Sequence, residues 1–323
     1  MRILVYGAGV IGCELAHMLH QGDNQVTLLA RGAWKNCIDQ NGLRIRHYVQ
    51  RRTTVDRLKT VEHLAPDEGY DLIFVVMQAG QLPAVLPELA QNRSPYLVLI
   101  GNNAAAEQTM CRITSTSPVK KELAFGFQGT GGRRENGTVI SVHAGVGMTV
   151  GGLHGPVSRE LRARLSKAFE GVTYRLTWEE QMDAWLKCHL VLILPVCYVC
   201  YAVGGKLPRA TRAQRRAILD AAYEGCRMLR TLGVPIRTED SEDYFRPGAK
   251  RWCMAAMLYL MAKTPLGRLA ASDHAMHAVG EMRELDEAFE TLRAQAGDPM
   301  PVWDALRGQM PDWAELERES TSA

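Results

Sequence analysis

The sequence predicts an α/β Rossmann-type N-terminal domain followed by an all-α C-terminal domain. Three observations support this fold class. Strand-like and helix-like segments alternate from residue 3 onwards, a glycine-rich turn joins the first strand to the first helix, and strand patterns stop after Thr177. The 323 residues are enough for two domains, which we place at residues 1–178 and 179–323.

The first strand and the first helix flank the glycine-rich turn. Ile3 to Tyr6 is an apolar run typical of a buried parallel strand, and Val10 to Leu19 has the apolar periodicity of a helix. Between them lies G-x-G-x-x-G, whose glycines allow a tight turn, the approach of a pyrophosphate and close helix–strand packing. The helix N-terminus adds free N–H groups and a positive dipole end. We therefore predict a dinucleotide-binding loop, with a merely structural turn as the alternative; its residues are Gly7, Ala8, Gly9, Val10, Ile11 and Gly12.

The end of the second strand indicates which dinucleotide binds. Gln25 to Leu29 reads as a strand, and Arg31 follows it, with no acidic residue until Asp39. An acidic residue at this place binds the ribose 2′-hydroxyl of NAD, whereas a basic residue suits the 2′-phosphate of NADP. The sequence favours NADP (NADPH) over NAD, although a solvated surface arginine would look the same.

Two further strands should place polar side chains beside this loop. Residues 71–76 and 96–100 read as buried strands, followed by Gln78 and by Asn102. Ligands of open α/β sheets lie beyond the carboxyl ends of the strands. If the strands are parallel, Gln78 and Asn102 share one edge with Gly7 and Arg31.

The remaining helices and strands are predicted from the spacing of apolar residues and from the positions of prolines and glycines. Residues 42–55 read as an exposed hairpin or edge strand, and 129–137 as a polar loop connecting a hairpin. Gly233 and Gly297 should end two helices, and the tail from Glu315 should be frayed. We expect strands at 123–127, 138–143, 148–151 and 172–176, and helices at 81–91, 156–169 (with proline in its first turn), 179–203, 209–232, 241–262 and 272–296.

Composition excludes several classes of protein. A net charge of +3 is too small to indicate nucleic acid or an anionic membrane as partner. The first strand leaves no room for a signal peptide, so we expect a cytoplasmic protein with reduced cysteines. Cys197 and Cys200 have C-x-x-C spacing inside an apolar run, which favours buried thiols over redox or zinc chemistry. That run, 188–203, is shorter than the ~20 residues of a bilayer span and reads as a core helix kinked at Pro195.

Two places in the second domain carry candidate chemistry. Lys187 stands just before the apolar run, where a lysine either snorkels at the helix edge or is a partly buried amine able to donate a proton. His274, His277 and Glu281 share one helical face. Their spacing is not that of a standard zinc site, so we expect no metal there and a polar face that either lines a cleft or is solvated.

These features together resemble the ketopantoate reductase (2-dehydropantoate 2-reductase) family over nearly the whole chain. The resemblance includes the 126–140 stretch GFQGTGGRRENGTVI. It implies hydride transfer from NADPH to the ketone of a 2-keto acid, as in pantothenate and coenzyme A biosynthesis. It implies that Lys187 is the general acid, Glu281 a substrate residue and Arg31 the 2′-phosphate contact. Asn102 would lie by the nicotinamide ribose, and His274 and His277 are further substrate candidates.

The sequence also departs from the family. The family commonly has lysine where Gln78 stands, and asparagines that bind substrate after the catalytic lysine; here no asparagine follows Asn136. The pocket is therefore suited to a larger or more apolar keto compound. Another β-hydroxyacid-dehydrogenase-type oxidoreductase and a non-catalytic NADP-binding sensor are the alternatives. A homodimer is compatible with these features.

Overall fold

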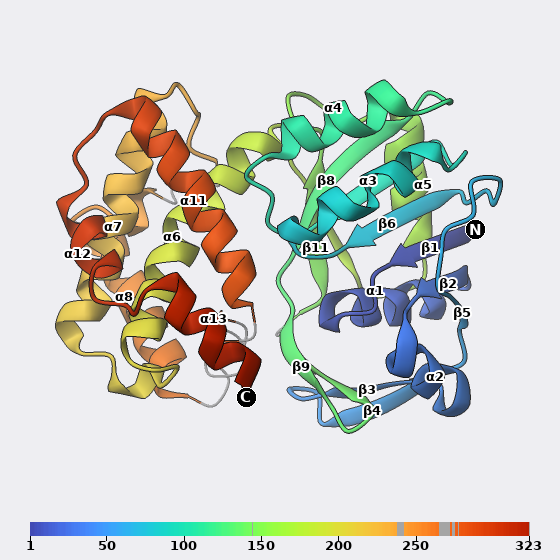
Figure 1. Cartoon of the computed structure of the whole chain (residues 1–323), viewed down its shortest axis with the longest axis horizontal. Coiled ribbons are helices and arrows are strands. Elements are labelled where there is room, and N and C mark those ends of the chain that lie inside the picture. Colours follow the sequence, from blue (N-terminus) through green and yellow to red (C-terminus); the bar gives the residue numbers. More distant parts are fainter. Residues whose placement is uncertain (144, 238–241, 265–271, 273–274, 277, 323) are drawn as a thin grey trace. The chain divides into compact units, whose positions relative to one another are not determined.

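The computed structural model describes residues 1–143, 145–237, 242–264, 272, 275–276 and 278–322. The chain divides into two compact units, Met1–Met182 and Asp183–Ala323. The first is an α/β unit and the second is helical, so the predicted fold class is confirmed (Figure 1).

An eight-stranded sheet forms the centre of the first unit. Its order is β12-β11-β8-β7-β6-β1-β2-β5, and every neighbouring pair is parallel except β8 and β11. From β5 to β8 this is the doubly wound order, with the switch point between β1 and β6. The strands are β1 (Arg2–Tyr6), β2 (Gln25–Leu29), β5 (Lys59–Val61), β6 (Leu72–Val76), β7 (Tyr96–Ile100), β8 (Glu122–Gln128), β11 (Gly147–Gly151) and β12 (Arg175–Trp178).

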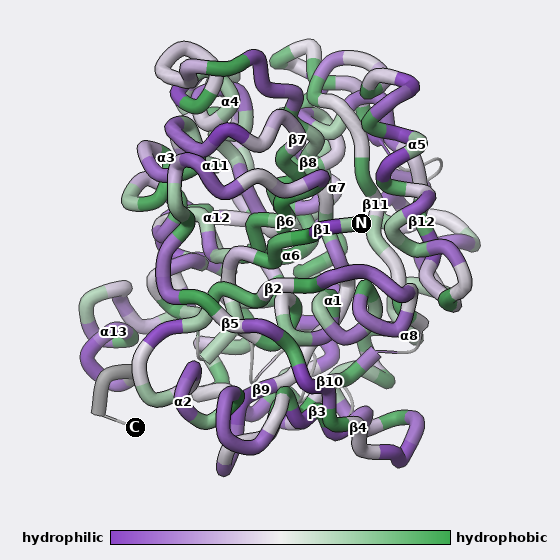
Figure 2. The backbone as a smooth tube through the Cα atoms, turned by 90° about the vertical axis from the view of Figure 1, so that its right-hand side faces the viewer, coloured by the Kyte–Doolittle hydropathy of each residue, from purple (hydrophilic) through white to green (hydrophobic). Residues whose placement is uncertain are grey.

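The central strands are apolar on both faces, and Figure 2 shows β1 and β6 as hydrophobic segments in the interior. Ile3 and Val5 share a core with α1 (Val10–Gln21) and α5 (Arg159–Ala168). The alternate residue Tyr6 points to the other face, where its hydroxyl reaches Glu88 of α3 (Leu82–Gln91). Helix α3 packs against α4 (Ala106–Thr116), so helices cover both faces of the sheet.

A second sheet of four strands, in the order β4-β3-β10-β9, packs against α1. The expected hairpin at 42–55 is confirmed as β3 (Leu43–His47) and β4 (Arg52–Asp56). The expectation of a loop at 129–137 was wrong in part, because β9 (Gly131–Glu135) pairs antiparallel with β10 (Thr138–Val142). Asn136 and Gly137 both have positive φ, as a tight two-residue hairpin turn requires, and this leaves the preceding residues free to form a strand.

Some predicted boundaries in this unit were also wrong. Helix α5 has its N-cap at Ser158, whose hydroxyl accepts a hydrogen bond from the N–H of Leu161, so Pro156 precedes the helix instead of lying in its first turn. The strand expected at 172–176 begins at Arg175. Three elements were not predicted from the sequence, because their sequence patterns are too short or too polar: α2 (Gly32–Asn41), α4 and β5.

The described part of the second unit is helical. Its α-helices are α6 (Met182–Ala202), α7 (Arg212–Thr231), α8 (Ala249–Lys263), α11 (Val279–Ala296), α12 (Pro301–Arg307) and α13 (Trp313–Ser322). Gly233 and Gly297 follow α7 and α11 with φ of +72° and +69°, which confirms them as helix stops. The helix expected from 241 begins after Gly248, and the tail is helical from Trp313 instead of frayed.

Helix α6 is long and apolar enough to cross a membrane by length and composition alone. However, 67% of its most apolar window is buried within the protein, which is the property of a core helix.

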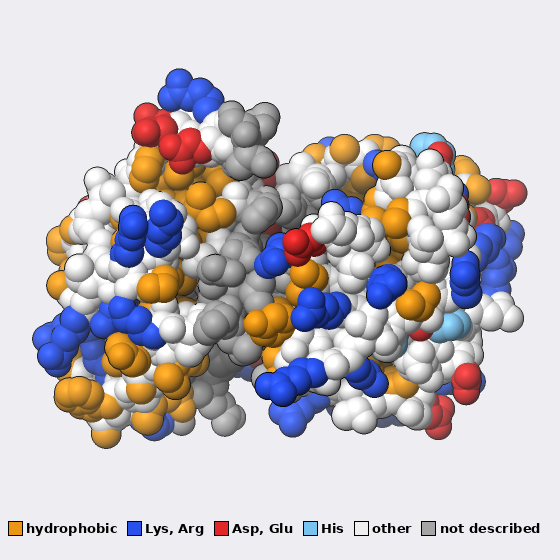
Figure 3. Space-filling view, turned by 90° about the horizontal axis from the view of Figure 1, so that it is seen from below, with side chains coloured by type: hydrophobic (Ala, Val, Ile, Leu, Met, Phe, Trp, Pro, Cys, Tyr) orange, Lys and Arg blue, Asp and Glu red, His pale blue; other side chains and the backbone are white. Residues whose placement is uncertain are grey.

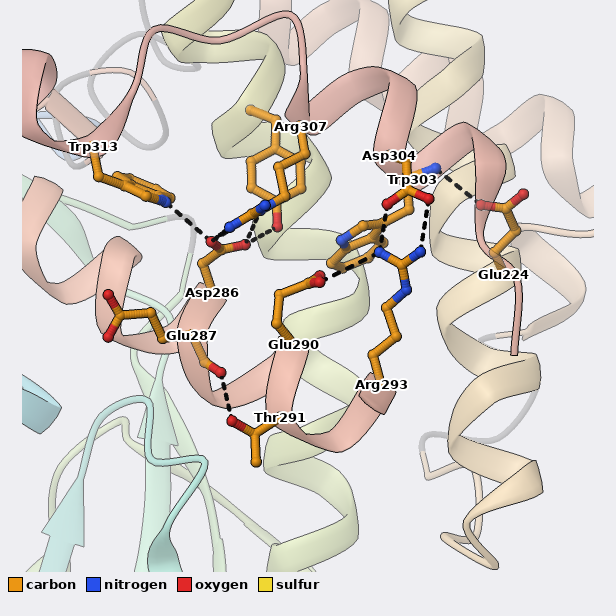
Figure 4. Close-up of polar contacts among 11 residues, drawn as sticks. Glu224, Asp286, Glu287, Glu290, Thr291, Arg293, Trp303, Asp304, Arg307 and Trp313 are labelled. Atoms are coloured by element: carbon orange, nitrogen blue, oxygen red, sulfur yellow. Dashed lines mark hydrogen bonds and ion pairs between the residues drawn. The ribbon is translucent and has the colours of Figure 1, made fainter. Parts of the chain in front are cut away.

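One buried carboxylate joins four helices of this unit (Figure 4). Asp286 of α11 is fully buried and accepts hydrogen bonds from Arg307 Nη2 of α12 at 2.8 Å and from Trp313 Nε1 of α13 at 3.0 Å. The hydroxyl of Tyr198 of α6 also donates to it. The carboxylate raises the pKa of the Arg307 guanidinium, so the charged pair is stable in this position.

Candidate cofactor and catalytic sites

The glycine-rich loop has the geometry of a phosphate cradle. Gly7 has φ +120°, and a Cβ there would lie 2.1 Å from the carbonyl oxygen of Val76 on β6. A Cβ on Gly12 would lie 1.9 Å from the carbonyl oxygen of Gly7. Only glycine fits at these two places. At Gly9, the N-cap of α1, a Cβ would meet nothing within 4 Å, so space remains in front of the helix N-terminus.

Side-chain hydrogen bonds that the sequence did not predict fix the positions of Ala8, in the glycine-rich loop, and of Arg31, after β2. Trp34 Nε1 of α2 donates to the carbonyl oxygen of Ala8 at 3.0 Å. The exposed Arg31, at the N-cap of α2, donates from Nη2 to the hydroxyl of Tyr6 at 2.9 Å. That hydroxyl in turn donates to Glu88 Oε2 at 2.5 Å. Burial and the Glu88 carboxylate raise the pKa of Tyr6, which stays a neutral phenol and supports the arginine. No local pattern could identify these partners, because each joins elements far apart in the sequence.

Gln78 and Asn102 lie at the expected edge. They follow β6 and β7, which are parallel to β1 and β2, so both share the carboxyl edge with the glycine loop and Arg31. Asn102 is 8% exposed. Its neighbour Asn103 accepts a hydrogen bond from the N–H of Ala105 at 3.0 Å, which shapes the turn into α4.

In the helical unit, Lys187 lies on the first turns of α6. Its Nζ is 2.5 Å from Asp183 Oδ2, one helical turn earlier, and both side chains are partly buried. The lysine is therefore an ammonium held by a carboxylate. Two residues further on, His189 stacks on Trp185 with ring centroids 5.2 Å apart. Burial lowers the pKa of His189 to about 4, so this imidazole is neutral at pH 7.

Glu281 is buried in the first turn of α11. The next residue, Met282, places its Sδ 3.4 Å from Cys197 Sγ of α6. Cys197 is ten residues beyond Lys187, which corresponds to roughly 15 Å along a helix axis. Glu281 therefore lies nearer to the second half of α6 than to Lys187. The histidines that should accompany it, His274 and His277, lie outside the described residues.

Charged side chains are dispersed over one face of the first unit. Figure 3 shows Lys and Arg side chains scattered over the face seen from below, with acidic side chains among them. Exposed Arg44 and Arg46 line a shallow hollow of about 420 Å³ on the second sheet.

The fold and the glycine-rich loop define the class: a protein with a Rossmann-type α/β unit followed by a helical unit. More particularly, residues 3–155 match the family described as ketopantoate reductase PanE/ApbA, which confirms the resemblance predicted from sequence. A 2-dehydropantoate 2-reductase of Lactococcus lactis subsp. lactis is 32% identical over 92 residues, but this covers only 28% of this chain and 29% of the relative.

Solved structures match over the whole chain. The PanE/ApbA family ketopantoate reductase from Ralstonia eutropha superposes with a TM-score of 0.73 at 18% identity and covers 99% of this chain and 100% of its own. A D-mandelate dehydrogenase determined with NADH and anilino(oxo)acetate gives 0.71 at 16% identity, with 99% of each chain covered. At these identities the likeness establishes the fold of both units.

Proposed function

We propose that this protein is an NADPH-dependent reductase of a 2-keto acid or a related carbonyl compound, similar in reaction to 2-dehydropantoate 2-reductase. The main support is the first sheet edge, where the space at Gly9 and the arginine at the end of β2 fit a pyrophosphate and a 2′-phosphate. Gln78 and Asn102 on the same edge are suited to contact the remaining ribose and nicotinamide. We expect the protein to work in the cytoplasm, and the homodimer stays a prediction.

The proposed roles of the residues follow from the chemistry of the reaction. NADPH supplies a hydride to the carbonyl carbon when it is bound. The Lys187 ammonium then stabilises the negative charge that develops on the carbonyl oxygen and gives it a proton. Asp183 holds Nζ at 2.5 Å and acts as a positioning residue. Glu281 remains a candidate for binding the far end of a substrate.

The residues after Lys187 favour an apolar substrate. They are Cys188, His189 and then a run of leucine, valine and isoleucine, with no asparagine to pair a substrate hydroxyl. A buried polar group without a partner is costly, so ketopantoate, which carries a hydroxyl, is disfavoured relative to an apolar 2-keto acid. The anilino(oxo)acetate in the D-mandelate dehydrogenase structure likewise carries an aromatic ring beside its oxo-acid group.

The test is NADPH oxidation with a panel of 2-keto acids that contains ketopantoate, phenylglyoxylate and short aliphatic acids. We expect turnover, with the aromatic or aliphatic acids preferred over ketopantoate. Tight NADPH binding without turnover of any ketone would instead indicate a non-catalytic NADP-binding protein. A preference for ketopantoate would show that groups other than asparagine bind its hydroxyl.

Lys187→Ala should lower single-turnover NADPH oxidation by about 10²–10⁴-fold and leave the NADPH dissociation constant nearly unchanged. The matched control is Lys250→Ala, because Lys250 also pairs with an aspartate, Asp243 at 3.3 Å, but on an exposed surface. If Lys187→Ala loses less than about tenfold while still folded, another residue is the acid.

A further inference from the structure

A group of buried polar side chains lies between α1 and the second sheet. Glu14 of α1 is 1% exposed, His47 at the end of β3 is 1% exposed, and His143, just after β10, is 6% exposed. Three titratable groups of this kind are rarely buried together unless they are paired or bind an ion.

The distances among these groups are those of metal ligands. Glu14 Oε1 lies 3.6 Å from His47 Nδ1 and 3.4 Å from His143 Nε2, and the three ligand atoms are all within 4.8 Å of one another. Ligands about 2.1 Å from a tetrahedral zinc ion are separated by roughly 3.4 Å. Both carboxylate oxygens of Glu14 and Nε2 of His143 are buried and make no hydrogen bond of good geometry among the described residues.

Each histidine also has an outer partner. The remaining nitrogen of His47, Nε2, lies 2.9 Å from Thr54 Oγ1 on β4, which can accept its hydrogen bond. The side-chain amide of Gln50 lies 3.5 Å from His143 Nδ1 through its nitrogen, and it must turn its oxygen to that atom to accept the Nδ1 hydrogen when Nε2 binds the ion. Histidine ligands of metals usually have such a partner on the second nitrogen, which fixes the tautomer and the ring orientation.

We propose that Glu14, His47 and His143 bind one divalent transition-metal ion, Zn²⁺ being the best fit, and that the ion fastens α1 to the second sheet. Imidazole and carboxylate are typical zinc ligands, and three protein ligands leave a fourth position for a water molecule. The buried hydroxyl of Ser141 on β10 is close enough to affect Glu14 and could orient that water. Nearby, His17 Nδ1 is 2.7 Å from Asp56 Oδ2, and the ring centroid of His17 lies 5.1 Å from that of His47.

The experiment is metal binding by the full chain freed of metal with a chelator and then desalted. We expect one Zn²⁺ per chain and, with Co²⁺ as probe, the intense visible absorption of a tetrahedral site. Less than about one tenth of an ion per chain, with no cobalt spectrum, would overturn the proposal and leave a metal-free polar cluster.

Variants locate the ion. Glu14→Gln and His143→Gln should each weaken Zn²⁺ binding by more than about a hundredfold. Thr54→Val, which alters only the outer partner and is safer for folding, should weaken it about 10–100-fold. The matched control is His154→Gln, because His154 also faces a glutamate, Glu107 at 3.6 Å, but both side chains are exposed. Equal affinity in wild type, control and all three variants would place the ion elsewhere and refute the assignment.

Discussion

Two alanine substitutions in the glycine-rich loop should separate binding from folding. Gly9 has φ −75°, which any residue adopts, and its Cβ would meet nothing within 4 Å. Gly9→Ala should therefore leave the apoprotein as stable as wild type or more stable by about 0.4–1 kcal/mol. The new methyl group would occupy space proposed for the pyrophosphate. Loss of one charge-assisted hydrogen bond, about 1.5–3 kcal/mol, would weaken NADPH binding about tenfold to 150-fold.

Gly12→Ala should behave differently. Its Cβ would lie 1.9 Å from the carbonyl oxygen of Gly7, which is backbone and must move. Overpacking of this kind costs about 1–3 kcal/mol, so both stability and NADPH affinity should fall. The assays are thermal unfolding of the apoproteins and fluorescence titration with NADPH.

The contrast between the two variants is the decisive result. If Gly9→Ala binds NADPH as wild type does, the pyrophosphate does not lie at the N-terminus of α1. If Gly12→Ala is as stable as wild type, the close packing of α1 against the β1 turn is not as described.

Three further predictions concern the cofactor, the helical unit and pH. Arg31→Ala should weaken NADPH binding about 10–100-fold and leave NADH binding unchanged, and equal losses for both cofactors in a titration would contradict the 2′-phosphate assignment. Asp286→Ala should lower the free energy of unfolding, measured in urea, by about 3 kcal/mol, because it leaves Arg307 and Trp313 without their acceptor. The control is Asp304→Ala, which breaks an ion pair with Arg293 from an exposed position. It should lower the free energy of unfolding by less than about 1 kcal/mol. The pKa of His189 is about 4 in the folded protein and near 6.5 in the unfolded chain, so its contribution to stability is complete above pH 6.5 and is lost as pH falls towards 4. The stability difference between wild type and His189→Gln should therefore change below pH 6.5 and be constant above pH 7.

The position of the glycine-rich loop at the carboxyl edge of the sheet was predictable because its signals are local. A strand, three glycines at fixed spacing and a helix follow one another within twenty residues, and the alternation of later strands placed Gln78 and Asn102 beside them. The strand β9 was missed because its glycines and arginines lack the alternation of apolar residues, and its pairing depends on the Asn136–Gly137 turn.

The less predictable features depend on contacts between distant segments. Glu14 and His17 did give a local signal, as two polar residues among the apolar residues of the buried stretch of α1. Their partners on β3, β4 and the end of β10 could be identified only from the fold. The support of Arg31 by Tyr6 and Glu88 likewise joins three elements that the sequence places up to 82 residues apart.

The carboxylate of Asp286 has a consequence for how the second unit comes apart. It lies on α11 and accepts hydrogen bonds from α6, α12 and α13. One carboxylate therefore connects the last two helices of the chain to the apolar helix α6. A terminal helix normally frays at low energetic cost, independently of the rest. Here, detaching α13 removes a partner from a fully buried charge, so its opening is coupled to that of the interior. We infer that the first turn of α13, which carries Trp313, opens together with the interior of this unit.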